Sequence, residues 1–149
     1  MIQIETTSHD PFFNQAFEDY VFRTFREDEV LLLWRNRPAV VVGCYQNICR
    51  EVHVRALLEQ NIPVVRRMSG GGTVYHDLGN LNYSFITDEE AGSLRLERFT
   101  APVVDALASL GLQAEASGRN DILVEGRKVS GTAQRLSGDR VLQIGRAHV

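Results

Sequence analysis

The sequence predicts an α/β protein of the α+β type, in which helices pack on a mixed, largely antiparallel sheet. Strand-like runs outnumber helical ones, and short turns join most of them. The regular strand–helix–strand alternation of a doubly wound parallel sheet is missing. The chain of 149 residues has 44% hydrophobic and 23% charged residues, which is typical of one globular domain with a single core.

The first elements are a helix and a pair of strands. Asp10 is a suitable N-cap, and Pro11 suits the first helical position. Helical spacing then predicts one inward apolar face made of Phe13, Phe17, Tyr20, Val21 and Phe25. The β-forming runs at 30–34 and 39–43 are separated by Asn-Arg-Pro, which predicts an antiparallel hairpin with both strands mostly buried.

Two more helices are predicted further along the chain. Residues 50–61 form the first, whose expected inward side chains are Val54, Leu57 and Leu58. A longer helix is expected from about 92 to 110, where Pro102 kinks the helix or resets its start. Gly111 is expected to end it, because glycine readily takes the left-handed conformation of a helix C-terminus.

The remaining runs are predicted strands. Three short ones surround a cluster of glycines, at 62–67, 73–76 and 81–86. Residues 121–131 read as a hairpin that turns at Glu125 and Gly126. Residues 135–144 read as a second hairpin that turns at 137–139. Most of the predicted sheet is therefore antiparallel.

Composition excludes several classes of partner. The net charge of −3 creates no general attraction for nucleic acid, so any anion site must be local. No apolar run approaches the roughly 20 residues that span a bilayer. The first ten residues lack the basic and apolar regions of a signal peptide. We therefore expect a cytoplasmic protein that binds neither nucleic acid nor membrane.

The two cysteines are predicted to be reduced thiols. Cys44 and Cys49 have four residues between them, which matches no familiar ligand spacing, and nothing marks the chain for secretion. A metal site formed with His53 is the less favoured alternative.

Residues 66–72 combine two arginines with three consecutive glycines. Three residues without Cβ allow successive backbone N–H groups to converge on an anion, and a guanidinium suits phosphate or carboxylate. Strand alternation sends Arg66 and Arg67 to opposite faces, so only one of them is expected to face the loop. The segment is not a P-loop, because it lacks the Lys-Ser/Thr pair and leads into a strand. An anion site and a simple flexible turn both remain open.

A second informative segment lies at 117–135. Asn120 and Asp121 stand where a loop enters a strand, and Lys128 follows a tight turn. A lysine in that place is most often a solvated hairpin charge. A functional role requires Lys128 to face the same cleft as the glycine loop.

Together these segments resemble the lipoate–protein ligase family over roughly residues 4–142. The resemblance is carried by RRMSGGGTVYHDLGNLNYSF, GRNDILVEGRKVSGTAQR, GCYQN and FNQAFED. It implies the catalytic-domain fold shared by biotin and lipoate ligases, which is related to class II aminoacyl-tRNA synthetases. It also implies ATP-dependent activation of lipoate to lipoyl-AMP, with Mg²⁺, followed by transfer to a lysine. The implied acceptors are the lipoyl domains of 2-oxoacid dehydrogenase E2 subunits and the glycine-cleavage H protein.

The resemblance also implies residue roles. Lys128 would be catalytic, contacting both the lipoyl carbonyl and the α-phosphate. The other expected ATP or adenylate contacts are Arg67, Gly72, Thr73, Val74 and Tyr75. The other expected lipoate contacts are Gly43, Gln46, Asn47, Gly71 and His76. Asp121 is expected to contact magnesium or an ammonium group.

Four polar residues after the glycines have structural interpretations. We expect His76 and Asp77 to stabilise the loop rather than react, because forming an adenylate requires no histidine base. Asn80 and Asn82 are expected to cap or hydrogen-bond the following turn.

The end of the chain departs from the family pattern. After a comparable strand the family continues with two histidines and Gly-Thr, whereas this chain reads IGRAHV. We therefore interpret 1–143 as a partial catalytic domain and 144–149 as an atypical tail that resembles a read-through artefact. Missing strands would leave a sheet edge uncovered, which favours poor solubility or aggregation. The truncated chain is expected to be inactive alone.

Two other functions remain open at this stage. One is an octanoyl or lipoyl transferase that works without ATP through a thioester on Cys44. A thiolate nucleophile needs a nearby base, and the sequence shows none beside Cys44. The other is a non-catalytic fragment that binds a lipoyl domain or an acyl-adenylate.

Overall fold

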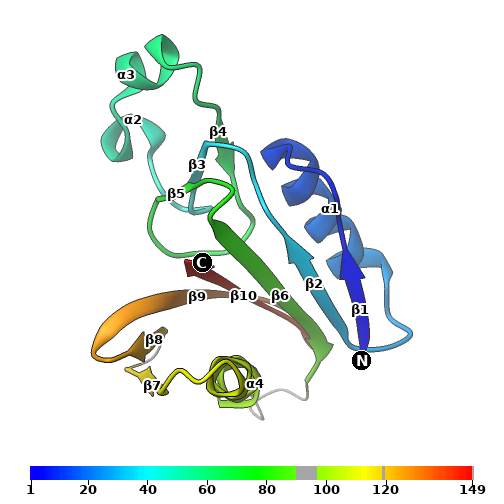
Figure 1. Cartoon of the computed structure of the whole chain (residues 1–149). Coiled ribbons are helices and arrows are strands. Elements are labelled where there is room, and N and C mark those ends of the chain that lie inside the picture. Colours follow the sequence, from blue (N-terminus) through cyan, green and yellow to red (C-terminus); the bar gives the residue numbers. More distant parts are fainter. Residues whose placement is uncertain (90–96, 119, 149) are drawn as a thin grey trace.

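The computed structural model describes residues 1–89, 97–118 and 120–148, and in them two β-sheets carry four helices (Figure 1). The larger sheet has the strand order β1 (Ile2–Glu5), β2 (Val30–Trp34), β6 (Asn80–Asp88), β10 (Arg140–His148), β9 (Arg127–Ser137), β8 (Asp121–Val124) and β7 (Ala114–Ser117). The smaller sheet has the order β4 (Val64–Arg66), β3 (Ala39–Val42) and β5 (Val74–His76). The helices are α1 (Pro11–Thr24), α2 (Ile48–Glu51), α3 (Val54–Glu59) and α4 (Glu97–Ser109).

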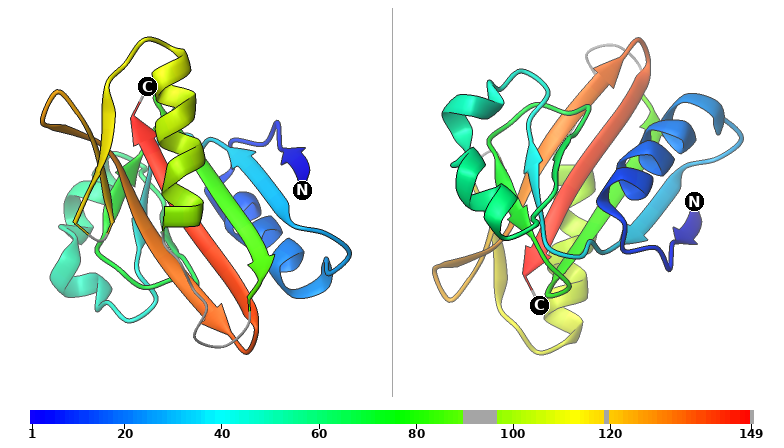
Figure 2. Two further views of the ribbon diagram at one scale, coloured as in Figure 1. Left: turned by 90° about the horizontal axis from the view of Figure 1, so that it is seen from below. Right: turned by 90° about the horizontal axis from the view of Figure 1, so that it is seen from above.

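Both sheets are mixed but mostly antiparallel, as predicted. Only β1–β2 in the larger sheet and β3–β4 in the smaller one are parallel pairs. Helices α1 and α4 lie on opposite faces of the larger sheet (Figure 2). The central strand β6 is therefore buried almost throughout. Its Ile86 packs in the cluster beneath α1, whereas its Phe85 packs against Phe99 of α4.

Helix α1 begins as predicted, and Phe17, Val21 and Phe25 of its predicted inward face do pack in the core. The carboxylate of Asp10 accepts hydrogen bonds from the N–H groups of Phe12 and Phe13, and Pro11 is the first helical residue. Phe13 and Tyr20, which were predicted to point inward, are 52% and 62% exposed. The buried face instead combines apolar and polar side chains: Asn14, Gln15, Glu18, Val21 and Phe22. Asn14 and Glu18 are buried with hydrogen-bond partners, whereas Gln15 borders the cavity described below.

The predicted hairpin between 30–34 and 39–43 is wrong. Strand β2 pairs with β1 and β6, whereas β3 pairs with β4 and β5 in the other sheet. The connecting segment is held at the start of α1 instead of turning back. Asn36 is fully buried and its amide oxygen accepts a hydrogen bond from Asn14, while the Arg37 N–H donates to His9 O. Burial of both strands was predicted correctly.

The predicted helix at 50–61 is also different in the structure. Two short helices, α2 and α3, replace it and extend away from the smaller sheet (Figure 1). His53 separates them, and its Nδ1 accepts a hydrogen bond from the Ala56 N–H as the N-cap of α3. Val54 and Leu58 are 44% and 73% exposed, so their predicted inward orientation is wrong.

Helix α4 agrees with the prediction where it is described. The expected start near residue 92 lies outside the described residues, and Pro102 lies inside the helix. Gly111 follows the helix with a φ of +81°, as a helix-ending glycine should. Among the described residues, no helix is long and apolar enough to cross a membrane.

Both predicted C-terminal hairpins are confirmed. Glu125 and Gly126 have φ values of 50° and 72°, which suit the two-residue turn between β8 and β9. Gly138, with a φ of 62°, turns β9 into β10. Strand β10 continues past Gln143, so residues 144–148 pair with β6 and mostly with β9 as well.

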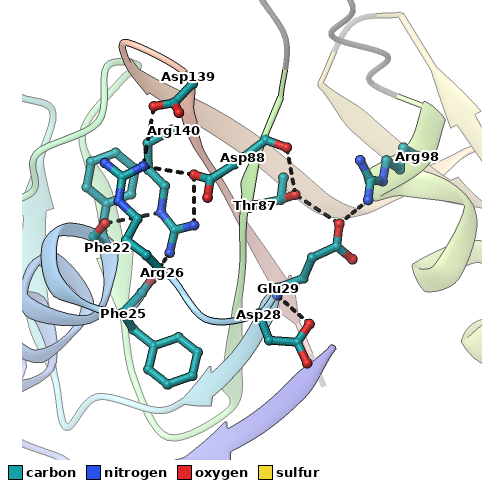
Figure 3. A network of polar contacts seen from close by, with 10 residues as sticks. All are labelled: Phe22, Phe25, Arg26, Asp28, Glu29, Thr87, Asp88, Arg98, Asp139 and Arg140. Atoms are coloured by element: carbon teal, nitrogen blue, oxygen red, sulfur yellow. Dashed lines mark hydrogen bonds and ion pairs between the residues drawn. The ribbon is translucent and has the colours of Figure 1, made fainter.

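A buried arginine joins the end of α1 to the larger sheet (Figure 3). Arg140 is 1% exposed, and its guanidinium donates to the carbonyl oxygens of Phe22 and Phe25. Its Nη1 lies 3.0 Å from the Asp88 carboxylate, which Arg26 contacts from the solvent side at 3.1 Å. A cation beside the last carbonyls of a helix satisfies acceptors that the helix leaves unpaired.

Replacing Arg140 with methionine is expected to lower the free energy of unfolding by about 2–4 kcal/mol, because it leaves buried carbonyl oxygens without a donor. Urea denaturation monitored by Trp34 fluorescence measures the loss. Arg26→Met is the matched control, and its exposed ion pair should contribute less than about 1 kcal/mol. Equal losses in the two variants would contradict this assignment.

Candidate functional site

A cavity of about 350 Å³ lies between the two sheets and brings most of the predicted site residues together. The predicted residues in its wall are Arg67, Gly71, Gly72, Val74, His76, Asp121 and Lys128. The rest of the wall combines apolar residues, such as Trp34, Val41 and Ala133, with polar ones, such as Asn120 and Arg146. The glycine loop and Lys128, more than fifty residues apart in the sequence, therefore share one hollow.

Strand β9 sets the distance between the glycine loop and Lys128. A Cβ added to Gly71 would lie 3.8 Å from the Cβ of Ala133. A Cβ added to Gly131, two residues earlier on the same face of β9, would lie 3.2 Å from Nζ of Lys128. Alternate residues of a strand are about 7 Å apart. An anion of phosphate size can therefore approach the loop and the ammonium group at once.

A β-bulge turns Lys128 toward this hollow. Asp121 pairs with Gly131, but Leu123 pairs with Lys128 because the register shifts between them. In an unbroken ladder Lys128 would pair with Val124 and point to the opposite face. The bulge thus places Lys128 on the face of Asp121, and its Nζ lies 2.8 Å from Asp121 Oδ1.

Asp121 makes the ammonium contact, one of the two contacts expected of it. Its carboxylate is engaged by an ammonium group, and the described residues contain no group of three or more His, Cys, Asp or Glu that could hold a metal. The same finding covers the alternative metal site at Cys44, Cys49 and His53, where both cysteines are free thiols.

Two signals for this corner of the site were missed. The first is that Lys128 is the only lysine among 16 Lys and Arg residues, so it provides the only side-chain ammonium group of the sequence. Gly131 is the second, because a Cβ there would lie 3.0 Å from Cε of Lys128. A glycine inside a strand often marks such a close approach, and Gly131 follows Lys128 by three residues.

Arg67 is the centre of the glycine loop. It is 7% exposed, and its Nη2 donates to Gly70 O at 2.7 Å and to Gly72 O at 2.8 Å. Its Nε also donates to Gly70 O, and Nη1 donates to Val41 O at 3.3 Å. Burial lowers the pKa of Arg67 from its usual value. As predicted, only one of the two arginines faces the loop.

The carbonyl contacts of Arg67 direct the backbone of the loop. In a trans peptide the C=O and N–H groups point in opposite directions. The N–H groups of Gly71 and Thr73 therefore point away from the guanidinium. A phosphate could reach the nitrogens of Arg67 only after these carbonyls are released, so the structure shows Arg67 shaping the loop.

Five predicted contacts lie outside the cavity wall: Gly43, Gln46, Asn47, Thr73 and Tyr75. Gln46 Oε1 accepts hydrogen bonds from the Gly43 N–H at 3.0 Å and the Thr73 hydroxyl at 2.8 Å. Asn47 caps α2, and Tyr75 is 46% exposed. The structure therefore places these residues behind or beside the glycine loop.

His76 is buried in the cavity wall and is neutral. Burial, helped by the charges of Arg146 and Arg67, lowers its pKa to about 3. Its Nδ1 lies 3.1 Å from the amide nitrogen of Asn36, so this ring atom accepts the hydrogen bond. Trp34 packs against the ring with a centroid distance of 6.0 Å. These contacts agree with the structural role expected of His76.

The turn after His76 is held by its own side chains, as expected. Asp77 Oδ1 accepts from the Gly79 N–H at 2.9 Å, and Asn80 Oδ1 accepts from the Asp77 N–H at 3.3 Å. Asn82 differs, because it is fully buried, lies in the cavity wall and donates to Trp34 O.

A buried acid behind the cavity was not predicted. Gln15 of α1 lies in the cavity wall, and Glu18, one turn later, is 2% exposed. The Ser84 hydroxyl donates to the Glu18 carboxylate and lies 3.4 Å from the indole nitrogen of Trp34. Burial raises the pKa of Glu18 to about 7, although Ser84 and Arg135 oppose the shift. Polar residues spaced by three on the inward face of a helix, here Gln15 and Glu18, are the signal that marks such a site.

Replacing Glu18 with glutamine is expected to flatten the pH dependence of stability. The unfolded acid ionises near pH 4.5 and the folded one near pH 7, so the wild-type protein loses stability as pH rises between them, by at most about 1.4 kcal/mol per pH unit. Glutamine cannot ionise, so the variant should gain on the wild type at pH 8. Urea unfolding at pH 5, 6, 7 and 8 tests this. The exposed control Glu59→Gln should follow the wild-type curve, and a parallel Glu18→Gln curve would refute the assignment.

Comparisons with known proteins agree with this geometry. The family described as lipoyl protein ligase A/B catalytic domain matches residues 10–147. Lipoate-protein ligase LplJ of Bacillus subtilis is 47% identical over 139 residues, covering 92% of this chain and 42% of the relative. This chain therefore spans about two-fifths of the length of that relative.

Two solved structures share the fold. Plasmodium falciparum LipL1 in complex with lipoate has a TM-score of 0.92 at 26% identity, covering 99% of this chain and 48% of that one. A bipartite lipoate protein ligase of Thermoplasma acidophilum, described with its E2 lipoyl domain, has a TM-score of 0.91 at 27% identity, covering 99% and 60%. With a family match over nearly its whole length, this chain belongs to the lipoyl protein ligase A/B catalytic domain family.

Proposed function

We propose that this chain is the part of a lipoate–protein ligase that activates lipoate with ATP and transfers the lipoyl group to a lysine of an acceptor domain. The observation that carries the proposal is the cavity in which Lys128 and the glycine loop share one face of β9. Its volume of about 350 Å³ is within the usual range for small-molecule sites. The relatives named above as lipoate ligases, one of them in complex with lipoate, support the choice of acid.

In the first step a carboxylate oxygen of lipoate attacks the α-phosphorus of ATP. The bond to the bridging oxygen breaks, pyrophosphate leaves, and lipoyl-AMP remains. Negative charge increases around phosphorus during this exchange, and no protein nucleophile is needed. The Lys128 ammonium, held by Asp121 at 2.8 Å, is the cation that meets this charge. Arg67 contributes its positive charge from beneath the loop while keeping its carbonyl contacts.

In the second step the neutral amine of the acceptor lysine attacks the carbonyl carbon of lipoyl-AMP. The bond between that carbon and the phosphate oxygen breaks, AMP leaves, and the amine releases a proton. Lys128 can stabilise charge on the carbonyl oxygen and on the departing phosphate, because both belong to the same mixed anhydride. The acceptors proposed are lipoyl domains of E2 subunits and the glycine-cleavage H protein, and the E2 lipoyl domain described with the Thermoplasma ligase supports the first.

Ligand protection of Lys128 tests substrate binding in this chain without requiring turnover. Because Lys128 is the only lysine, an amine-acetylating reagent modifies only Nζ and the N-terminal amine. A non-hydrolysable lipoyl-AMP analogue at ten times its Kd should slow acetylation of Lys128 about tenfold. The N-terminal amine, which pairs with Asp28, is the internal control and should react at an unchanged rate. Unchanged labelling of Lys128 would contradict the proposed site.

Catalysis is tested in a protein that contains this chain at the length of its relatives. Lys128→Met should lower lipoate-dependent ATP–pyrophosphate exchange about 10²–10³-fold, the loss typical of removing one group that stabilises transition-state charge. Asp121→Asn should cause a smaller loss, because the ammonium remains but is less well held. Wild-type protein that lacks lipoate-dependent exchange would defeat the proposal.

Cys44→Ala distinguishes the thioester alternative. Cys44 is not among the cavity-lining residues, and its N–H donates to Ser69 O at 3.0 Å. The variant should therefore retain its activity. A loss as large as that of Lys128→Met would favour acyl transfer through the thiol.

A further inference from the structure

Arg66, the first arginine of the pair, makes a set of contacts for which the proposed function has no use. Its Nη1 donates to Gly43 O at 2.8 Å, Cys44 O at 3.2 Å and Gln46 O at 2.8 Å. One nitrogen thus holds three carbonyl oxygens of the turn that follows β3. Arg66 pairs with Val42 across β3 and β4, so its side chain starts beside this turn.

The turn held by Arg66 presses directly on the glycine loop. A Cβ added to Gly43 would lie 2.1 Å from Gly71 O, so the two backbones are already in contact. The Cys44 N–H donates to Ser69 O at 3.0 Å. Displacing the turn would therefore release the backbone on both sides of Gly70.

Gln46 forms the second connection between the two segments. Its Oε1 accepts from the Gly43 N–H within the turn and from the Thr73 hydroxyl beyond the loop. Arg66 holds the backbone of the same residue through Gln46 O. The two side chains thus act on one turn. Arg66 donates to carbonyl oxygens of the turn, and Gln46 accepts from an N–H group of the turn.

We propose that Arg66 and Gln46 are positioning residues that brace the 43–46 turn against the glycine loop and keep the loop ready to receive the acyl-phosphate group. The inference rests on the proposed function for its ligand, but the brace itself is a property of the chain. It gives the adjacent arginines separate tasks. Arg67 shapes the loop from within, and Arg66 supports it from behind through the 43–46 turn.

The brace predicts which substitutions are tolerated. All three contacts of Arg66 leave from one nitrogen, so the lysine ammonium of Arg66→Lys can replace most of them, whereas Arg66→Met cannot. Both contacts of Gln46 end on an acceptor oxygen, so Gln46→Glu should retain them and Gln46→Met should not. The matched control is Arg55→Met, which removes an exposed arginine from α3.

The test combines two measurements on the same variants. Hydrogen–deuterium exchange of the amides at 43–46 and 70–73 should become about tenfold faster in Arg66→Met and in Gln46→Met, with the urea midpoint unchanged. Affinity for the lipoyl-AMP analogue, read from protection of Lys128, should fall about tenfold in both. Arg66→Lys, Gln46→Glu and Arg55→Met should stay near the wild type. The double variant that combines Arg66→Met and Gln46→Met should lose little more affinity than either single variant, because both substitutions disrupt the same brace.

The two measurements separate the brace from the proposed function. Faster exchange at 70–73 without any ligand protection in the wild type supports the brace and refutes the proposed ligand. Normal protection in the wild type together with unchanged exchange and affinity in Arg66→Met overturns the brace. Additive losses of affinity in the double variant also overturn the brace, because Arg66 and Gln46 would then act independently.

Discussion

The buried guanidinium of Arg67 holds the glycine loop by its carbonyl oxygens, and the wall of the cavity depends on this contact. A loop with three glycines has little conformational preference of its own, because glycine accepts most backbone angles. Gly71, with a φ of +94°, shows how far the backbone uses this freedom. The Arg67 guanidinium removes this freedom, because its Nε and Nη2 donate to Gly70 O and its Nη2 also donates to Gly72 O. The glycines therefore permit many conformations of the loop, but the contacts of Arg67 select one of them.

On the opposite wall of the cavity, polar contacts also fix a group that is flexible by itself. Lys128 is a flexible side chain, and its direction is decided by the backbone bulge in β9 and by the carboxylate of Asp121. Gly131 provides the space into which the lysine folds. Neither wall relies on a deep apolar anchor for its charged group. Lys128 is held by Asp121 of β8, and Arg67 is held by carbonyl oxygens of its own loop and of β3. The ammonium group of Lys128 can therefore meet an anion directly, whereas Arg67 acts through its charge from beneath the loop.

Local signals predicted much of this protein correctly. The N-cap Asp10, the turn glycines at 126 and 138 and the helix-ending Gly111 were recognised because their roles depend on residues close in sequence. The partners of β2 and β3 were not recognised. The short segment between the two strands favoured a hairpin. Instead, Asn14 of α1 hydrogen-bonds to Asn36, and the chain continues into the second sheet. A contact across 22 residues cannot be read from a local pattern.

The sequence by itself determined the family, the turn positions and the identity of the two charged segments, because these are carried by contiguous motifs and by a single lysine. The tertiary structure alone decided that Lys128 and Gly71 line one cavity over the same face of β9, that Gln46 lies behind the loop, and that Glu18 is buried. For Lys128 the physical reason is that side-chain direction in a strand reverses with a one-residue shift of register. For Gln46 and Glu18 it is that their partners, Thr73 and Ser84, are distant in the sequence. A one-residue shift of register leaves no mark in the local sequence pattern, so only pairing with distant strands determines it.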